Sequence, residues 1–264
     1  MNQSDTAIRL KKVRQQEIYE LMKLKRSVTV DYLARTLYAS PTTIRRDLEI
    51  LEKNGLISRI HGGAIIAESY SSEIAQTFRE TLNSDKKQLI ASLVEQFLRN
   101  NQTIFLDGST TNRFLIPIFK KFSNIIFITN SFKTVNELIE LPDSEIYLAG
   151  GKVLKNFNHT SGYLTVDFLN NFRSEIGIIA CKGISATSGC SVVNLDQSII
   201  KRTMIKNAKI RILLCDSSKF DKVYLFHFAD FRDFDYLITD QLPSEDLRNA
   251  IESSGCKIIT KRED

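Results

Sequence analysis

An alternation of short apolar runs with helical patterns, from residue 103 to residue 238, constrains the fold of this chain more than any other feature. The apolar runs occupy residues 103–106, 125–128, 145–148, 176–180, 210–214 and 236–238. Short, continuously apolar runs between helices are typical of strands buried on both faces of a parallel sheet. We therefore predict an α/β domain in which helices cover a mainly parallel sheet.

Polar turns follow these apolar runs. The turns are Asp107-Gly108-Ser109-Thr110-Thr111, Thr129-Asn130, Gly150-Gly151, Cys181-Lys182-Gly183, Asp216-Ser217-Ser218-Lys219 and Thr239-Asp240. Ligands of open α/β sheets bind beyond the carboxyl ends of the strands. The turns therefore predict a ligand site at that end of the sheet.

The first turn has the composition of a phosphate-binding loop. Gly108 permits close approach of the backbone, and Ser109, Thr110 and Thr111 offer hydroxyl and amide donors. A helix that starts after Thr111 would direct its N-terminus at an anion. A loop of this composition can also do no more than cap its helix, so both interpretations stay open. We predict Lys219, in a later turn, as a second contact to a phosphate or a sugar hydroxyl.

The first 66 residues carry a different pattern. Ile44, Leu48 and Leu51 recur at helical spacing behind Ser40, a predicted N-cap, and form a buried face. The polar side chains left on the outer face are Thr42, Thr43, Arg45 and Arg46. Two shorter helical patterns precede this helix, and a basic hairpin follows Gly55. This order predicts a winged helix-turn-helix, with Arg59 and His61 on the wing.

The excess of positive charge lies entirely in this N-terminal part. Residues 1–63 contain 12 Lys or Arg and 7 Asp or Glu, whereas residues 64–264 contain 24 of each. Basic charge concentrated on one small domain is typical of nucleic-acid binding. The charge distribution therefore indicates a DNA-binding domain without any appeal to motifs.

Residues 14–64 resemble the DNA-binding half of the DeoR family of bacterial repressors. The matching motifs are Thr43-Ile44-Arg45-Arg46-Asp47-Leu48, Leu51-Glu52, Gly55-Leu56-Ile57 and Arg59-Ile60-His61-Gly62-Gly63-Ala64. The turns of the second half, together with Lys201-Arg202, are similar to the sensor domain of the same family. The resemblance implies a sensor fold similar to ribose-5-phosphate isomerase and the coenzyme A transferases. It also implies that the turns line a pocket for a phosphorylated sugar or a related metabolite.

Two positions depart from the family pattern. Asp196 stands where a glutamate is expected before Lys201, and Lys182 adds a cation beside the sheet. The shorter side chain of Asp196 reaches less far, so the identity of the effector cannot be carried over from the family.

These arguments define two sets of site residues. The residues predicted to contact DNA are Thr42, Thr43, Arg45, Arg46, Arg59 and His61. The residues predicted to bind the effector are Asp107, Gly108, Ser109, Thr110, Thr111, Thr129, Asn130, Gly150, Gly151, Lys182, Gly183, Asp196, Lys201, Asp216 and Lys219.

The predicted domain boundaries follow from the same patterns. Residues 1–66 form the DNA-binding domain, residues 67–84 a linker, and residues 85–264 the sensor domain. The sensor domain is expected to open with an amphipathic helix that Ser84 or Asp85 caps, that extends to Leu98 and that buries Leu89 among its apolar residues.

The chain is expected to repress a carbohydrate-metabolism operon under the control of a phosphorylated sugar, as a homodimer or homotetramer, because one small head reads few base pairs. No apolar run is long enough to span a membrane, so the expected location is the cytoplasm. Three histidines and four isolated cysteines favour neither a metal site nor disulfides, and no cofactor is predicted. The alternative is a sugar-phosphate isomerase or lyase fused to a DNA-binding head, with Asp107 or Asp196 as the base.

Overall fold

The computed structural model of the chain describes residues 3–66, 79, 82–154 and 157–261. Contacts divide the chain into two compact units, Met1–Leu82 and Asn83–Asp264. Most of the predicted linker, residues 67–84, lies outside the described residues. Among the described helices, none is long and apolar enough to cross a membrane.

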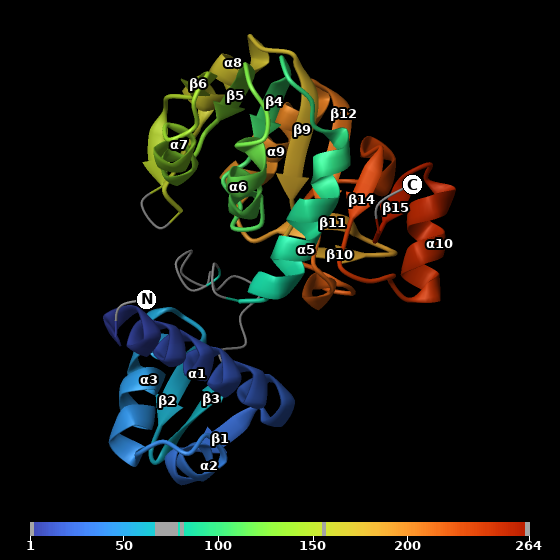
Figure 1. Cartoon of the computed structure of the whole chain (residues 1–264). Helices are drawn as coiled ribbons and strands as arrows, with labels where there is room; N and C mark the ends of the chain where they lie inside the picture. Colours follow the sequence, from blue (N-terminus) through green and yellow to red (C-terminus); the bar gives the residue numbers. More distant parts are fainter. Residues whose placement is uncertain (1–2, 67–78, 80–81, 155–156, 262–264) are drawn as a thin grey trace. The chain divides into compact units, whose positions relative to one another are not determined.

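The N-terminal unit is a winged helix-turn-helix, as predicted (Figure 1). Its elements are α1 (Gln3–Lys25), β1 (Ser27–Thr29), α2 (Val30–Thr36), α3 (Pro41–Lys53), β2 (Ile57–Ile60) and β3 (Gly63–Ile66). The three strands form an antiparallel sheet in the order β1-β3-β2. The wing approaches β1 so closely that a Cβ on Gly63 would lie 2.2 Å from the Val28 carbonyl oxygen. Only glycine fits there.

Local sequence signals position α3. The Ser40 hydroxyl accepts a hydrogen bond from the Thr43 amide at 3.1 Å, and Pro41 occupies the first turn. The apolar face of α3 packs into one core with α1 and α2; the residues of α3 in that core are Ile44, Leu48 and Leu51. Packing of this face leaves the polar face of α3 outside.

The C-terminal unit is built on a seven-stranded parallel sheet in the order β15-β14-β12-β9-β4-β5-β6 (Figure 1). The strands are β4 (Thr103–Leu106), β5 (Ile125–Thr129), β6 (Ser144–Leu148), β9 (Ser174–Ala180), β12 (Ala208–Leu214), β14 (Tyr236–Ile238) and β15 (Lys257–Ile259). All neighbouring pairs in this sheet are parallel. The six predicted strands are confirmed, and β15 adds a seventh at the edge.

The chain changes direction once in this sheet. It proceeds from β4 to β5 and β6, and then returns to β9 on the other side of β4. From β9 it continues outward through β12, β14 and β15. The switch point between β4 and β9 is where open α/β sheets bind ligands, because the adjacent loops diverge there.

Helices cover both faces of the sheet. One face packs against α5 (Ser84–Val94), η2 (Asn112–Leu115), α6 (Ile116–Phe119) and α7 (Phe132–Leu138). The other face packs against α8 (Tyr163–Asn170), α9 (Leu195–Lys206) and α10 (Glu245–Ser253). Successive strand residues alternate between the two cores, as Ile104 and Phe105 do in β4. Burial on both faces explains why the strands are continuously apolar.

The helix expected to run from Ser84 to Leu98 is shorter than predicted. Asn83 precedes it, α5 ends at Val94, and the 3-10 turn η1 (Glu95–Phe97) follows. Leu89, expected in the core, is exposed. Only a narrow stripe of α5 packs against η2 and the sheet. The position of a leucine around the helix, and not the number of apolar residues, therefore decides whether it is buried.

Besides β1 and β15, five short strands of the C-terminal unit were not predicted from the sequence. β7 (Lys152–Leu154) and β8 (His159–Ser161) form an antiparallel pair. β10 (Gly183–Ser185), β11 (Gly189–Val192) and β13 (Phe226–Ala229) form a second small sheet. The 3-10 turns η3 (Ser217–Lys219) and η4 (Phe231–Asp233) complete the described elements. Strands of three or four residues depend on tertiary pairing and carry little periodic signal.

Candidate functional site

The polar face of α3 is exposed in the N-terminal unit. Thr42, Arg45 and Arg46 are exposed, and Thr43 is half-buried, because its hydroxyl hydrogen-bonds the Ser40 hydroxyl at 2.8 Å. Two guanidinium groups and a hydroxyl therefore point outward from one short helix. This combination suits phosphate oxygens and the edges of base pairs in a major groove.

A buried carboxylate fixes the orientation of α3. Asp47 accepts hydrogen bonds from Arg14 Nε at 2.6 Å and from Gln15 Nε2 at 2.8 Å, both on α1. The Arg14 contact is an ion pair with the carboxylate almost fully buried. Asp47 lies in the motif quoted above, but its partners lie 32 and 33 residues away, so the sequence did not predict this contact.

On the wing, His61 and Arg59 are exposed, but Arg59 has an intramolecular partner. Its amide and its Nε donate to the Glu52 carboxylate at 2.8 and 2.7 Å. Hydrogen bonds from the Arg59 amide and side chain lower the pKa of Glu52 from its ordinary value. The turn before α3 also presents Tyr38, which is 97% exposed with a positive φ of 51°. The sequence analysis did not select this residue.

At the switch point of the sheet, Asp107 and Lys201 form a buried ion pair across 94 residues of sequence. Lys201 Nζ also donates to the Ala180 carbonyl at 2.8 Å, and the Ala180 amide donates to Asp107 Oδ2 at 3.0 Å. The group joins β4, β9 and α9 at one point. Burial raises the pKa of Asp107, but the Lys201 ammonium and the two backbone amides of Ala180 and Ser109 outweigh it, and the pKa is lowered.

The turn after Asp107 is partly occupied by its own hydrogen bonds. The Ser109 amide donates to Asp107 Oδ1 at 2.9 Å, and the Ser109 hydroxyl accepts from the Asn112 amide at 3.2 Å. By contrast, the main-chain amides of Thr110 and Thr111 have no hydrogen-bond acceptor among the described residues. The Thr111 hydroxyl is buried and also has no hydrogen-bond partner among the described residues. These donors are the ones that an anion could use.

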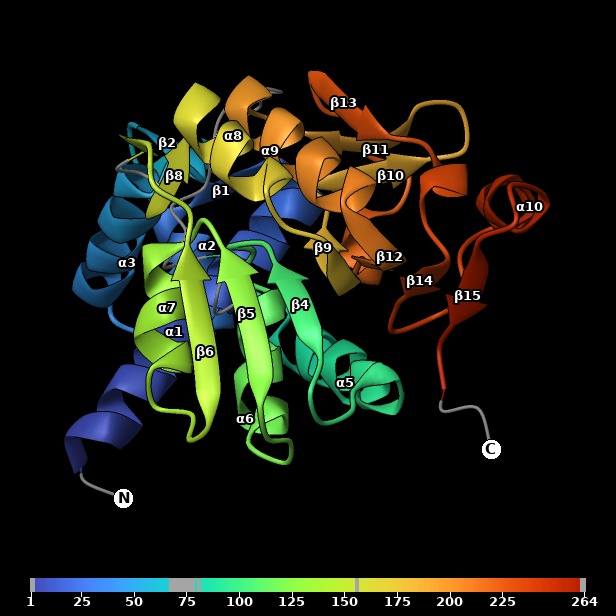
Figure 2. The same cartoon turned by 90° about the horizontal axis from the view of Figure 1, so that it is seen from above.

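His159 covers the backbone of Gly108. Its Nε2 lies 2.9 Å from the Gly108 carbonyl oxygen, and a Cβ on Gly108 would lie 2.0 Å from that nitrogen. His159 belongs to β8, which follows the Gly150-Gly151 turn. Figure 2 shows β8 beyond the arrowhead end of β6. Packing of His159 against Gly108 therefore requires glycine at this position.

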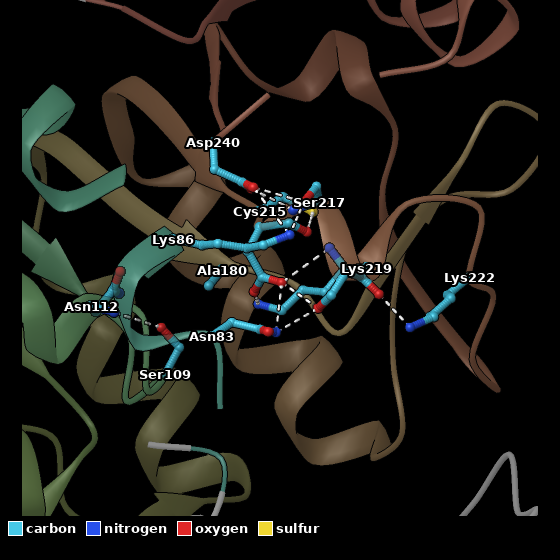
Figure 3. Close-up of polar contacts among 12 residues, drawn as sticks. Asn83, Lys86, Ser109, Asn112, Ala180, Cys215, Ser217, Lys219, Lys222 and Asp240 are labelled. Atoms are coloured by element: carbon cyan, nitrogen blue, oxygen red, sulfur yellow. Dashed lines mark hydrogen bonds and ion pairs between the residues drawn. The ribbon is translucent and has the colours of Figure 1, made fainter. Parts of the chain in front are cut away.

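A second cluster surrounds the turn after β12 (Figure 3). The buried Asp216 carboxylate lies 3.2 Å from Lys219 Nζ and accepts from Asn83 Nδ2 at 3.3 Å. Burial raises the pKa of Asp216, but the Lys219 ammonium and its hydrogen bonds lower it to about 2. Burial lowers the pKa of Lys219, yet the Asp216 carboxylate raises it above its ordinary value. Both groups are therefore charged at neutral pH.

The start of α5 contributes to this second cluster. Asn83 Nδ2 also donates to the Ser218 hydroxyl at 2.8 Å, and Lys86 Nζ lies 3.3 Å from Asp240 Oδ2. Asp240 also accepts from the Ser217 amide at 2.6 Å. The first turn of the C-terminal unit is thus bonded to the polar ends of β12 and β14.

A thiol lies between the two clusters. Burial raises the pKa of Cys181, but a hydrogen bond from the Cys215 thiol and the ammonium groups of Lys219 and Lys201 lower it below its ordinary value. Ala180 pairs with Leu214 in the parallel sheet, so Cys181 and Cys215 follow neighbouring strands and the two clusters lie at the ends of β9 and β12.

Four predicted site residues connect the turns after β5 and β6 with β8 and α8. Asn130 Nδ2 donates to the Thr160 carbonyl at 2.8 Å, and Thr129 Oγ1 accepts from the Ser131 amide at 3.2 Å. Gly150 O accepts from Thr165 Oγ1 at 2.7 Å, and a Cβ on Gly151 would lie 2.2 Å from the same hydroxyl. These residues position backbone around the site.

The last three predicted residues contact other parts of the C-terminal unit. The Lys182 ammonium lies 5.9 Å from the centre of the Tyr224 ring, and Gly183 packs so tightly that a Cβ would lie 2.3 Å from the Lys222 carbonyl oxygen. Asp196 lies in the first turn of α9 and accepts from the Ser161 hydroxyl at 3.4 Å.

Sequence reasoning missed Asn112, His159 and Asn83. Asn112 Nδ2 donates to Asp107 Oδ1 at 2.8 Å and to the Ile178 carbonyl at 2.9 Å, which ties the turn to β9. Asn112 directly follows the quoted turn, so its position was the available signal. Nothing in the sequence links His159 or Asn83 to distant turns.

Comparison with known proteins accounts for both units. Residues 14–70 match the DeoR-like helix-turn-helix domain, and residues 82–241 match the DeoR C terminal sensor domain. The HTH-type transcriptional regulator YulB of Bacillus subtilis is 32% identical over 93% of this chain and 95% of its own length. The glycerol-3-phosphate regulon repressor of Escherichia coli is 31% identical over 86% of this chain and 89% of its own length.

Among solved structures, ribose 5-phosphate isomerase A of Methanocaldococcus jannaschii aligns with a TM-score of 0.39 and 14% identity, covering 52% of this chain and 55% of that chain. The 4-hydroxybutyrate CoA-transferase of Porphyromonas gingivalis aligns with a TM-score of 0.42 and 14% identity, covering 64% of this chain and 51% of that chain.

Proposed function

Since this chain belongs to the DeoR family, we propose that it represses a carbohydrate-metabolism operon and that a phosphorylated sugar or related metabolite controls its affinity for operator DNA. The E. coli relative is a glycerol-3-phosphate regulon repressor, and GlcR of B. subtilis, 28% identical, is a transcriptional repressor. Two or four copies present paired heads to the operator in the cytoplasm, because one head alone reads too few base pairs.

The outward face of α3 is the observation that carries the DNA-binding role. Its exposed groups are a hydroxyl and two guanidinium groups, on a helix whose opposite face is buried and whose Asp47 is fixed by α1. We place Thr42, Thr43, Arg45 and Arg46 in a major groove, and Arg59, His61 and Tyr38 against the phosphate backbone. Tyr38 is 97% exposed despite its positive φ of 51°, and a phosphate contact would offset the cost of that backbone conformation.

We place the phosphate of the effector at the Thr110 hydroxyl and at the main-chain amides of Thr110 and Thr111, which have no acceptor among the described residues. Lys201 and Lys219 contribute positive charge, Asp107 holds Lys201 in place, and Asp216 Oδ2, which has no hydrogen-bond partner among the described residues, can accept from a sugar hydroxyl. Thr129, Asn130, Gly150 and Gly151 shape the backbone of the pocket. Lys182, Gly183 and Asp196 form its outer boundary.

The second cluster supplies a route from effector to DNA. Asn83 and Lys86 open the C-terminal unit and are bonded to Asp216, Ser218 and Asp240. An effector that hydrogen-bonds these side chains in place of Asn83 and Lys86 releases the first turn of α5. In the sequence, this turn follows the segment that leads from the DNA-binding head. The change in operator affinity can be no larger than the difference in effector affinity between the two arrangements, typically about 1–3 kcal/mol.

The geometry favours binding over catalysis. A general base needs a pKa near the working pH, whereas the pKa of Asp107 is lowered by its ion pair with Lys201. Asp196 lies beside the Ser161 hydroxyl. We therefore retain the isomerase or lyase only as an outcome of the test below.

The experiment has two stages. First, sheared genomic DNA is enriched by binding to the full chain, which identifies an operator. Second, the affinity of the chain for that operator is measured by fluorescence anisotropy at fixed salt, with and without each member of a panel of triose, pentose and hexose phosphates. We expect one of them to weaken binding. Lys219→Ala and Thr110→Ala should bind the operator normally and lose that response.

Failure of the wild-type chain to bind any fragment, or unchanged binding with every sugar phosphate, would contradict the proposal. Turnover of a sugar phosphate, followed by NMR in the same samples, would favour the catalytic alternative.

A further inference from the structure

An apolar patch lies exposed at the N-terminal ends of α8 and α9. We define the α8–α9 patch as Tyr163 and Leu164 on α8 with Leu195 and Ile199 on α9. The exposed fractions of these residues are 79%, 66%, 49% and 37%. Large apolar side chains grouped on one surface of a soluble protein mark interaction sites, whereas single exposed ones need no explanation.

The four side chains belong to neighbouring helix ends. α8 and α9 pack against each other and against β8, as Figure 2 shows. Ser161, two residues before α8, hydrogen-bonds Asp196 in the first turn of α9 at 3.4 Å. Both helices connect to strands of one parallel sheet, so they run in the same direction. Their exposed apolar residues therefore form one surface.

Charged groups of opposite sign lie further along the same exposed faces. Asp167 follows Tyr163 by four residues on α8, and Arg202 follows Ile199 by three on α9, and both are exposed. Arg202 donates to the Ser198 hydroxyl at 2.7 Å. Neither side chain has an ion-pair partner in residues 3–66, 79, 82–154 and 157–261.

From this arrangement we infer that the α8–α9 patch binds the same patch of a second copy of this chain. A two-fold interface must be self-complementary, so a patch that meets itself needs both members of every ion pair. An apolar centre with Asp167 on one side and Arg202 on the other meets this requirement, since each Asp167 then faces the partner's Arg202. DNA would not select an apolar surface with a carboxylate.

The inference rests on the proposed function in one respect, because paired half-sites require paired heads. It also places the interface next to the effector site: the inner face of α9 carries Lys201, and its outer face carries Ile199. A shift of α9 on effector binding would thus reach the interface directly.

The test is a charge exchange measured by sedimentation equilibrium on the full chain. Asp167→Arg and Arg202→Asp, each alone, place like charges opposite each other and should raise the dimer dissociation constant at least tenfold. An equimolar mixture of the two variants should restore wild-type association, because both cross-interface pairs are again of opposite sign. The double variant should restore it as well.

Leu164→Glu should weaken association as strongly, and Ile139→Glu, at a similarly exposed position at the C-terminal end of α7, should leave it unchanged. Circular dichroism verifies that each variant is folded. The inference would be overturned by a wild type that is monomeric at 100 μM, or by a mixture that fails to restore association. Unchanged association of Leu164→Glu and of both charge variants would overturn it as well. Loss of DNA binding by the wild type would instead refute the proposed function, since association is measured without DNA.

Discussion

Replacing Lys201 by methionine leaves the Asp107 carboxylate buried without its cation. Removing one partner of a buried ion pair costs about 3–5 kcal/mol. Asp107 keeps its hydrogen bonds from the amides of Ala180 and Ser109 and from Asn112, so the loss should lie at the lower end, about 3 kcal/mol. The double variant Asp107→Asn/Lys201→Met removes the buried charge and should recover most of that loss.

The pH dependence gives an independent check. In the wild type the folded pKa of Asp107 is lowered, so its stabilisation is present above the unfolded pKa of about 3.9 and is lost as pH falls through the folded pKa. Without Lys201, burial raises the pKa above the unfolded value. The variant is then destabilised near neutral pH, and its stability recovers as the Asp107 carboxylate takes up a proton. The stability gap between the two proteins should therefore narrow from pH 7 toward pH 4.

Urea unfolding of the full chain, followed by circular dichroism at 222 nm, measures both effects. The N-terminal unit provides an internal reference, since its transition should not move. Arg248→Met is the matched control: its partner Glu252 lies one turn away on an exposed helix face, and such pairs contribute at most about 0.5 kcal/mol. A Lys201→Met variant within about 0.5 kcal/mol of wild type, or a gap independent of pH, would refute the reasoning.

Three further predictions follow from the same geometry. Gly108→Ala should destabilise the C-terminal unit by about 1–3 kcal/mol, because its Cβ would lie 2.0 Å from His159 Nε2, whereas Gly150→Ala, with nothing within 4 Å, should change the melting temperature little. The pKa of Asp216, lowered to about 2, corresponds to about 2 kcal/mol of stability that is present above pH 4 and lost as pH falls toward 2. The unfolding free energy of Asp216→Asn should therefore approach that of wild type by about 1 kcal/mol between pH 7 and pH 3, and a constant difference would contradict the lowered pKa. Arg46→Ala should weaken operator binding by about 1–3 kcal/mol. Specificity should relax at one base pair if the guanidinium binds a guanine, whereas all sequences should weaken alike if it contacts phosphate. Normal operator affinity in fluorescence anisotropy would exclude both roles.

Local signals in this chain were sufficient for its longer elements. Ser40 caps α3 through its hydroxyl, as predicted, and Thr29 caps α2 in the same way. Six strands of the parallel sheet were found because burial on both faces makes each one continuously apolar. The failures are equally local: β7 and β8 are too short and too polar to show a period, and the end of α5 depends on what packs against it.

The sequence by itself determined the two-part architecture, the outward basic face of α3 and the turns that gather at one end of the sheet, because these depend on residues within a few positions of each other. Only the tertiary structure decided that Asp107 is neutralised by Lys201, that His159 covers Gly108, that Asn83 is bonded to Asp216, and that the apolar ends of α8 and α9 form one surface. Each of these contacts joins residues separated by at least 35 positions. Their partners are selected by how the sheet and its helices pack, which no short stretch of sequence encodes.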